Sequence, residues 1–172
     1  IIGLRKEITL VVNGEIQQVT TYALTVRGVL RSQDYALSEF DHLSPSPGTL
    51  LSDKETIYFR VSSTIEIQAD GKTVSLQTAE IRPENVLLAA GFSVFPKDRI
   101  LVDGEQIDKE TYLAAGKDHQ IRILRGTPLT VITGNGATFF ISDGDNLAEA
   151  FAREGLSVRD VDQLSLPLET PL

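Results

Sequence analysis

The chain of 172 residues contains no cysteine, methionine or tryptophan. Without cysteine, disulfide frameworks, thiolate zinc sites and cysteine nucleophiles are all excluded. No apolar run approaches the roughly 20 residues that a membrane-spanning helix requires. Because methionine is absent and the chain opens with Ile1-Ile2, we expect an internal fragment whose signal peptide or anchor would lie upstream.

Basic residues are scarce, with 16 Lys and Arg against 24 Asp and Glu and a net charge of −8. Residues 128–172 hold 2 basic and 7 acidic groups, whereas residues 1–63 hold 6 and 7 and residues 64–127 hold 8 and 10. Nucleic-acid binding requires a basic stripe, and binding to an anionic membrane surface requires basic clusters. The composition therefore predicts no contact with nucleic acid or membrane by this fragment.

The same pattern occurs three times along the chain. Each copy has a strand-like run, an Asn-Gly or Asp-Gly dipeptide, a second strand-like run, a helix-like run and a lone aspartate. These scaffold positions are Gly14, Gly71 and Gly136 in the dipeptides, followed by Asp41, Asp98 and Asp162. The distance from glycine to aspartate is 27, 27 and 26 residues in turn. Repeats that share scaffold residues but no reactive side chain indicate binding or spacer modules.

The first repeat has the pattern of a hairpin followed by a helix. Apolar residues alternate over residues 8–12, and Asn13-Gly14 suits a type I′ turn, which requires positive φ at both central positions. The returning strand is expected over residues 15–22. Thr25 is placed to cap a helix. The apolar face of that helix would consist of Val26, Val29 and Leu30.

The second repeat shows the same features with an offset of 57 residues. Asp70-Gly71 predicts the turn, and Pro83 falls at the first helical position, where its missing N–H has no cost. Val86 and Leu87 supply the apolar face of the helix. Gly91 suits a left-handed C-terminal cap.

In the third repeat, Asn135-Gly136 predicts the turn, and Phe139 and Ile141 are the alternating apolar positions of the return strand. One of the adjacent Phe139 and Phe140 must therefore leave the core or meet a neighbouring module. Asn146 is the predicted helix cap. The helical stripe is expected to consist of Leu147, Ala150 and Phe151.

A final strand closes each of the first two repeats, at residues 56–61 and 120–124. A hairpin, a helix and a last strand form the β-grasp order, in which the last strand lies beside the first and the helix covers one face of the sheet. The fold class is therefore α+β, with tandem β-grasp (ubiquitin-like) modules in an elongated array. The second repeat carries about seven extra residues, which we place in a loop insertion near 102–117.

Three units follow from this reading: residues 1–63, residues 64–127 with the insertion, and residues 128–172, which stop where a closing strand should begin. The linkers at Ser62-Ser63 and residues 126–128 are too short to behave as flexible chains. We therefore expect a semi-rigid rod.

Candidate reactive groups have structural explanations. Asp41, Asp98 and Asp162 lie about sixty residues apart, so we expect them to bond backbone amides in turns rather than to converge on a metal or act as acid and base. Residues 142–146 resemble part of a calcium loop but fall in repeat register at a turn and helix cap. His42 and His119 occupy non-equivalent positions, which we place in exposed loops. No catalytic, cofactor-binding or metal-binding residue is predicted.

The chain resembles the ubiquitin-like repeats of bacterial resuscitation-promoting factors and related cell-wall proteins. The resemblance begins with E-I-T-L-V-V-N-G-E-I-Q-Q-V-T-T-Y-A-L-T-V-R-G-V-L at residues 7–30 and continues through Asp41, Ser44-Pro45 and Ile57. The third unit matches through T-V-I-T-G-N-G, then G-L-S-V-R-D-V-D, then residues 165–167. In that family the repeats often precede a five-glycine adhesive domain and a wall-hydrolase domain.

The resemblance implies a non-catalytic extracellular spacer or interaction module of a secreted or anchored cell-envelope protein. Such a module would position a wall-directed domain, bind envelope polymer or contact another envelope protein. Two alternatives stay open. One is a glycan-binding β-grasp module of a polysaccharide export system, and the other is part of a peptidoglycan hydrolase whose catalytic domain lies outside this fragment.

The third unit raises a specific expectation about its first strand, residues 129–133. An edge without its neighbour leaves a row of backbone groups free to pair with another chain. We expect either further residues that complete the fold or a strand exchanged between copies, with residues 1–4 as a conceivable donor.

Overall fold

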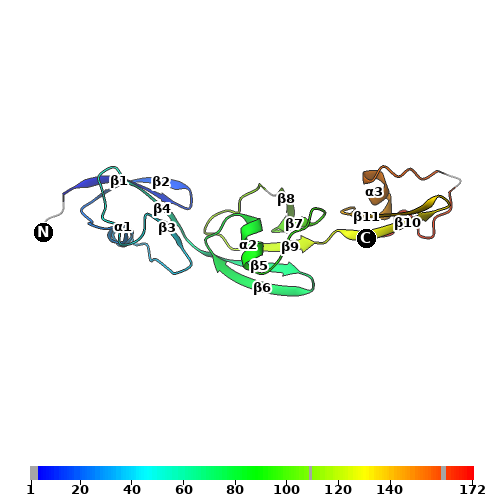
Figure 1. Cartoon of the computed structure of the whole chain (residues 1–172). Coiled ribbons are helices and arrows are strands. Elements are labelled where there is room, and N and C mark those ends of the chain that lie inside the picture. The colour runs from blue at the N-terminus through cyan, green and yellow to red at the C-terminus, as the bar shows by residue number, and fades with distance from the viewer. Residues whose placement is uncertain (1–3, 109, 160–161) are drawn as a thin grey trace.

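The computed structural model describes residues 4–108, 110–159 and 162–172. Within these residues, three sheets and three short helices follow one another along the chain, and Figure 1 shows the sheets in a row. This mixture of antiparallel and parallel pairing with few helices is compatible with ubiquitin-like domains. None of the helices in the described ranges is long and apolar enough to cross a membrane.

The first sheet has the strand order β2-β1-β4-β3, and its closing strand β4 runs parallel to β1. Its elements are β1 (Lys6–Val12), β2 (Glu15–Thr21), α1 (Val26–Ser32), β3 (His42–Ser44) and β4 (Thr56–Arg60). The predicted neighbour relation of the first and last strands is therefore confirmed. The short strand β3, which pairs antiparallel with β4, was not predicted.

Local chemistry explains these elements. Asn13 and Gly14 have φ of 51° and 93°, which fits the type I′ hairpin turn between β1 and β2. Thr25 Oγ1 accepts a hydrogen bond from Gly28 N at 3.3 Å and caps α1 as predicted. The apolar face of α1 is fully buried against the sheet, at Val26, Val29 and Leu30.

The second sheet has the order β6-β5-β9-β7-β8, and its closing strand β9 runs parallel to β5. Its elements are β5 (Ser63–Ala69), β6 (Lys72–Thr78), α2 (Pro83–Ala89), β7 (Arg99–Val102), β8 (Glu105–Ile107) and β9 (His119–Leu124). Pro83 opens α2 as predicted. The segment near 102–117 includes a hairpin that was missed, because Asp103-Gly104 forms a turn with φ of 52° and 90° between β7 and β8.

The third sheet contains β10 (Thr127–Thr133) and β11 (Gly136–Ser142), followed by α3 (Leu147–Arg153). Asn146 caps α3 and the predicted stripe of α3 is buried. Residues 168–172 return to the start of α3, where Leu147 N donates to Thr170 O at 3.1 Å. Among the described residues β10 pairs only with β11, and residues 1–3 of the conceivable donor strand lie outside them.

The turn of the third sheet differs from the prediction. Thr133 pairs with Gly136, so Gly134 and Asn135 form the turn and Gly136 is the first residue of β11. A shift of one residue exchanges the two faces of a strand. Phe139 and Ile141, which were predicted to face the core, are exposed at 66% and 43%, whereas Phe140 is half-buried and Ser142 is buried at 2%.

The prediction for His119 was also wrong. His42 is exposed, although it lies in β3, but His119 is buried at the start of β9. Its Nδ1 lies 2.8 Å from Asp103 Oδ2 and its Nε2 lies 3.2 Å from Ala114 O. The residues between β7 and β9 fold over this position, which repeat register alone does not reveal.

Candidate functional site

Two short links join the successive sheets. The first link consists of Val61 and Ser62, between β4 and β5, and the second link consists of Arg125 and Gly126, between β9 and β10. Ser63, Thr127 and Pro128 were predicted to lie in the linkers, but in the structure they belong to β5 and β10. Each link is therefore only two residues long.

Two of the three repeat aspartates accept hydrogen bonds both from a local turn and from a link. Ser38 N donates to Asp41 Oδ2 at 2.7 Å, and Phe95 N donates to Asp98 Oδ2 at 2.9 Å. The other oxygen of each aspartate accepts from the link, from Ser62 N at 2.7 Å and from Gly126 N at 3.2 Å. Both amides lie two residues beyond the end of a closing strand, so we call Asp41 and Asp98 the linker aspartates.

Asp162 has the turn contact of the other two aspartates. Arg159 N donates to its Oδ2 at 2.9 Å, and the Arg159 guanidinium donates to Oδ1 at 3.1 Å. These bonds lower the pKa of Asp162 and raise that of Arg159. The structure thus places all three aspartates in separate turns and does not bring them together.

The hairpin turns contact the links as well, with different chemistry in the two sheets. At the first link, Asn13 Oδ1 accepts from Val61 N at 2.9 Å. At the second link, the Arg125 guanidinium donates to both oxygens of Asp70, at 2.8 and 2.7 Å. Gly14 and Gly71 complete these turns with positive φ, and Gly136 has φ of 133° at the start of β11.

Arg125 of the second link donates hydrogen bonds to three residues, Asp70, Ser93 and Asp98. Besides Asp70, it donates to Asp98 Oδ2 at 2.5 Å and to Ser93 O at 2.8 Å. The Asp98 side chain is only 4% exposed, so this partner neutralises a nearly buried carboxylate. The hydrogen bonds that Arg125 donates to Asp70 lower the pKa of Asp70, and those that it donates to Asp70 and Asp98 raise its own pKa.

Glycine permits close approach at both links. A Cβ at Gly116, in the loop before β9, would overlap Asn13 Nδ2 of the first sheet. A Cβ at Gly126 would lie 2.7 Å from Ile141 Cγ2 and 2.9 Å from Lys97 Cβ. The second sheet therefore contacts the first through Gly116 and the third through Gly126, and exposed Ile141 lies beside the second link.

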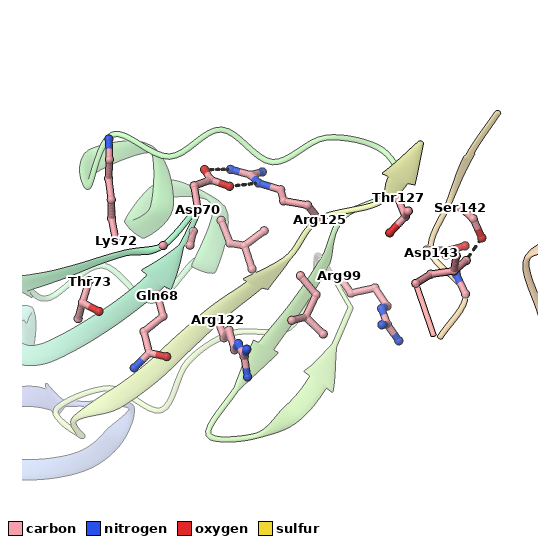
Figure 2. A pocket seen from close by; sticks show the side chains of 16 residues that line it. Gln68, Asp70, Lys72, Thr73, Arg99, Arg122, Arg125, Thr127, Ser142 and Asp143 are labelled. Atoms are coloured by element: carbon pink, nitrogen blue, oxygen red, sulfur yellow. Dashed lines mark hydrogen bonds and ion pairs between the residues drawn. The ribbon is translucent and has the colours of Figure 1, made fainter. Parts of the chain in front are cut away.

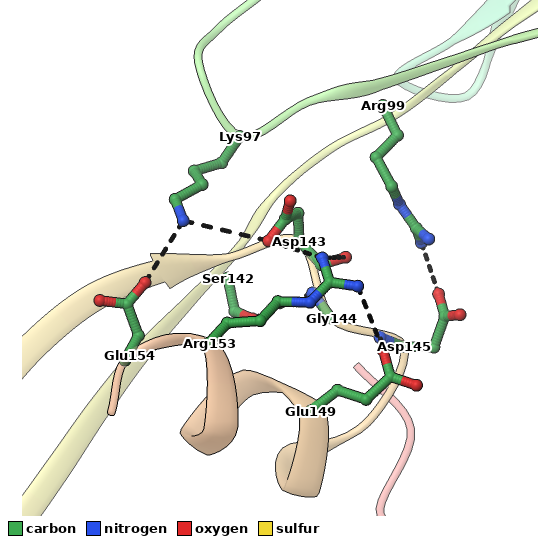
Figure 3. A network of polar contacts seen from close by, with 9 residues as sticks. All are labelled: Lys97, Arg99, Ser142, Asp143, Gly144, Asp145, Glu149, Arg153 and Glu154. Carbon is green, nitrogen blue, oxygen red and sulfur yellow. Dashed lines mark hydrogen bonds and ion pairs between the residues drawn. The ribbon is translucent and has the colours of Figure 1, made fainter. Parts of the chain in front are cut away.

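Ion pairs join the second and third sheets, as Figure 3 shows. Lys97 Nζ lies 3.3 Å from Glu154 Oε1 and 4.0 Å from Asp143 Oδ1, and Arg99 Nη2 lies 2.6 Å from Asp145 Oδ1. Asp143 also pairs with Arg153 at 2.9 Å. Burial raises the pKa of Asp143, but the contacts with Arg153, a backbone hydrogen bond and the charge of Lys97 together outweigh it, so the pKa is lowered.

These contacts account for residues 142–146, which resembled part of a calcium loop. Ser142 Oγ accepts from Gly144 N at 3.0 Å, and Asn146 Oδ1 accepts from Glu149 N at 2.9 Å. The carboxylates of Asp143 and Asp145 face lysine and arginine side chains. Within the described residues, no group of three or more His, Asp or Glu side chains could hold a metal ion.

A cleft of about 470 Å³ lies beside the second link, as Figure 2 shows. Strands of the second sheet form one side, and residues 142–144 of the third sheet border the other. Its charged lining consists of Lys72, Arg99, Arg122, Arg125, Asp70 and Asp143. Of the four cationic side chains, Arg99 is paired with Asp145, and Arg125 is paired with Asp70 and Asp98. Lys72 and Arg122 form no ion pair among the described residues.

Two comparisons bear on this arrangement. Residues 8–48 match the protein-family model described as G5-linked-Ubiquitin-like domain. Over 168 residues, or 98% of the chain, the sequence is 23% identical to Resuscitation-promoting factor Rpf2 of Corynebacterium glutamicum, and it spans 43% of the length of that relative. The resemblance to the ubiquitin-like repeats of resuscitation-promoting factors is thereby confirmed.

Proposed function

We propose that the chain is a non-catalytic spacer module of a bacterial cell-envelope protein, which holds a wall-directed domain at a distance from its anchor. In this proposal each sheet with its helix is one ubiquitin-like module, and the modules follow one another at residues 1–63, 64–127 and 128–172. The protein would be secreted or anchored, as the similarity to a resuscitation-promoting factor supports.

The observation that carries the proposal is the bonding of both links. Each link has two residues, and each is held by a linker aspartate and by the preceding hairpin turn. A free two-residue link would allow neighbouring modules to swing, whereas a bonded one restricts their orientation. Restricted orientation is the property that a spacer requires.

The non-catalytic character is supported by the separation of the aspartates. A glycoside hydrolase of the usual kind needs two carboxyl groups roughly 5–10 Å apart. Asp41 and Asp98 lie in different sheets, and each has both oxygens occupied by backbone amides or Arg125. This environment suits a structural carboxylate.

Small-angle X-ray scattering tests the rod. A compact globule of 172 residues would have a radius of gyration of about 16 Å. We expect a clearly larger value and a distance distribution with the tail of an elongated particle. A value near that of the globule would contradict the spacer proposal.

An assay on purified peptidoglycan tests the absence of catalysis. We expect no release of soluble fragments by the wild-type chain. Turnover that is abolished by Asp98→Asn, with the variant still folded, would show an enzyme instead.

A further inference from the structure

We propose that the cleft beside the second link binds a linear acidic polysaccharide that carries carboxylate groups. The inference goes beyond the spacer role and does not depend on it, because a rod without a ligand would still separate two domains. It rests on the side chains that the second sheet presents on the face opposite α2.

Three exposed polar residues form a row across neighbouring strands of this face. Gln68 of β5 pairs in register with Thr73 of β6 and with Arg122 of β9. Opposed residues on adjacent strands have Cβ atoms about 5 Å apart. The row therefore offers an amide, a hydroxyl and a guanidinium at a spacing that suits the substituents of successive sugar rings.

Arg122 is the group best placed to take a carboxylate. Within the described residues its guanidinium forms no hydrogen bond or ion pair, and Figure 2 shows it beside Gln68 on the open side of the sheet. A guanidinium presents parallel donors that match a carboxylate bidentately. Lys72, which lines the same cleft and forms no ion pair among the described residues, adds a second positive charge, whereas the charge of Arg99 is neutralised by Asp145 at 2.6 Å.

Three acidic groups near the row are already paired with cations, and Asp145 pairs with Arg99. Asp70 is paired with Arg125, and Asp143 is paired with Arg153. Glu66 lies on the same face and keeps its charge, and its Oε1 accepts a hydrogen bond from Gln68 Nε2 at 3.0 Å. That bond leaves the carbonyl oxygen of Gln68 to accept from a sugar hydroxyl.

The form of the cleft favours a segment of polymer over a small molecule. Its volume of about 470 Å³ falls within the ordinary range for ligand sites, roughly 300–1,000 Å³. The three residues of the row are all exposed, so a polymer segment can lie across the strands.

A titration of the full 172-residue chain with hexameric oligogalacturonate, followed by amide chemical shifts, tests the proposal. We expect shifts in β5 and β9 around Gln68 and Arg122, and little change with neutral maltohexaose. Arg122→Gln should weaken binding about tenfold or more, because one charge-assisted contact is lost. Arg82→Gln, which removes an exposed arginine outside the cleft lining, should bind as the wild type does.

Wild-type affinity in the Arg122→Gln variant would overturn the proposal, as would equal binding of maltohexaose or the absence of any shift. Because Arg122 is exposed and unpaired, its replacement leaves the fold intact, and the amide spectrum verifies this. The spacer proposal is tested separately by scattering, which Arg122→Gln should not change.

Discussion

The two links hold neighbouring sheets by different means. At the first link the contacts are backbone amides on Asn13 and Asp41 and the close fit of Gly116 against Asn13. At the second link the contacts are dominated by charge: Arg125 on Asp70 and Asp98, Lys97 on Glu154, and Arg99 on Asp145. One junction therefore depends on shape and hydrogen bonds, and the other on ion pairs.

The difference accounts for part of the uneven charge along the sequence. Residues 128–172 hold 7 acidic and 2 basic groups, and three of these acids, Asp143, Asp145 and Glu154, face Lys97 and Arg99. These three acidic residues of the C-terminal segment therefore serve the contact between the second and third sheets. Exposed ion pairs are weak singly and screened by salt, so the second junction should respond to conditions that leave the first unchanged.

The largest effect is expected from Arg125→Ala. It removes the partner of the nearly buried Asp98 carboxylate and frees the second link, at a cost of about 2 kcal/mol in the unfolding free energy of the second module. Urea unfolding followed by amide signals of the second sheet measures it. Arg122→Ala, the unpaired arginine on the preceding strand, is the matched control and should cost less than about 0.5 kcal/mol. Equal effects of the two variants would show that the link contacts contribute nothing.

The next effect is expected from Gly116→Ala at the first junction. The residue has φ of 69°, which costs an alanine about 1 kcal/mol, and the added methyl group must displace Asn13. Gly104→Ala is the control, since Gly104 has φ of 90° and no atom within 4 Å of the added Cβ. The excess loss of Gly116→Ala over Gly104→Ala, and a shift of the Asn13 side-chain amide signal, would report the junction contact. Identical losses and an unmoved Asn13 signal would exclude it.

Acid should weaken both junctions. Bonds from Gln120 N and His119 lower the pKa of Asp103, whose partner His119 also bonds the loop that carries Gly116. Asp70 and Asp143 at the second junction have lowered pKa values as well. A carboxylate with a lowered pKa stabilises the fold above its unfolded value of about 3.9, and this stability disappears as pH falls below that value. Thermal unfolding between pH 7 and pH 2.5 should show constant stability near neutrality and loss below pH 4. A loss already complete at pH 5 would contradict the assignment.

Salt should weaken the second junction and leave the first unchanged. This is the smallest of the expected effects. Lys97 and Arg99 form exposed pairs worth about 0.5 kcal/mol each. Hydrogen exchange at the second link should therefore accelerate in 1 M NaCl, while exchange at Val61 and Ser62 should not. The Lys97→Gln/Arg99→Gln double variant should reduce the salt response and leave the part that depends on Arg125 and Asp70. A response at both links would mean that the first junction also depends on charge.

Local sequence rules predicted most of the secondary structure. The turns at Asn13-Gly14 and Asp70-Gly71, the caps at Thr25 and Asn146 and the buried helical stripes follow from contacts within a few residues. The hairpin at Asp103-Gly104 was missed although it carries the same dipeptide signal. It was overlooked because it has no counterpart in the other repeats.

The third hairpin shows how a small irregularity carries information. The spacing from Gly136 to Asp162 is 26 residues, whereas Asn135 to Asp162 is 27, the value in the other two repeats. The structure places the turn at Gly134 and Asn135, which restores the common spacing. Attention to that one residue would have assigned Phe140 and Ser142, rather than Phe139 and Ile141, to the inner face.

The contacts of the links could not be predicted from the repeat. Asp41 and Asp98 were expected to bond local turns, but their second oxygens reach amides 21 and 28 residues away. Arg125 occupies the position equivalent to Val61. Val61 donates its backbone amide to the hairpin turn at Asn13, whereas Arg125 donates its guanidinium to the hairpin turn at Asp70. Pairing of this kind depends on the three-dimensional approach of two sheets, which no local pattern describes.

The central claim, that the links hold the modules in fixed orientations, is tested most directly by distances between spin labels. The chain has no cysteine, so Thr20→Cys with Ser75→Cys spans the first link and Ser75→Cys with Thr138→Cys spans the second, all at exposed positions. We predict a narrow distance distribution for both pairs at low salt, broadening for the second pair in 1 M NaCl or with Arg125→Ala. Broad distributions for both pairs at low salt would contradict the account.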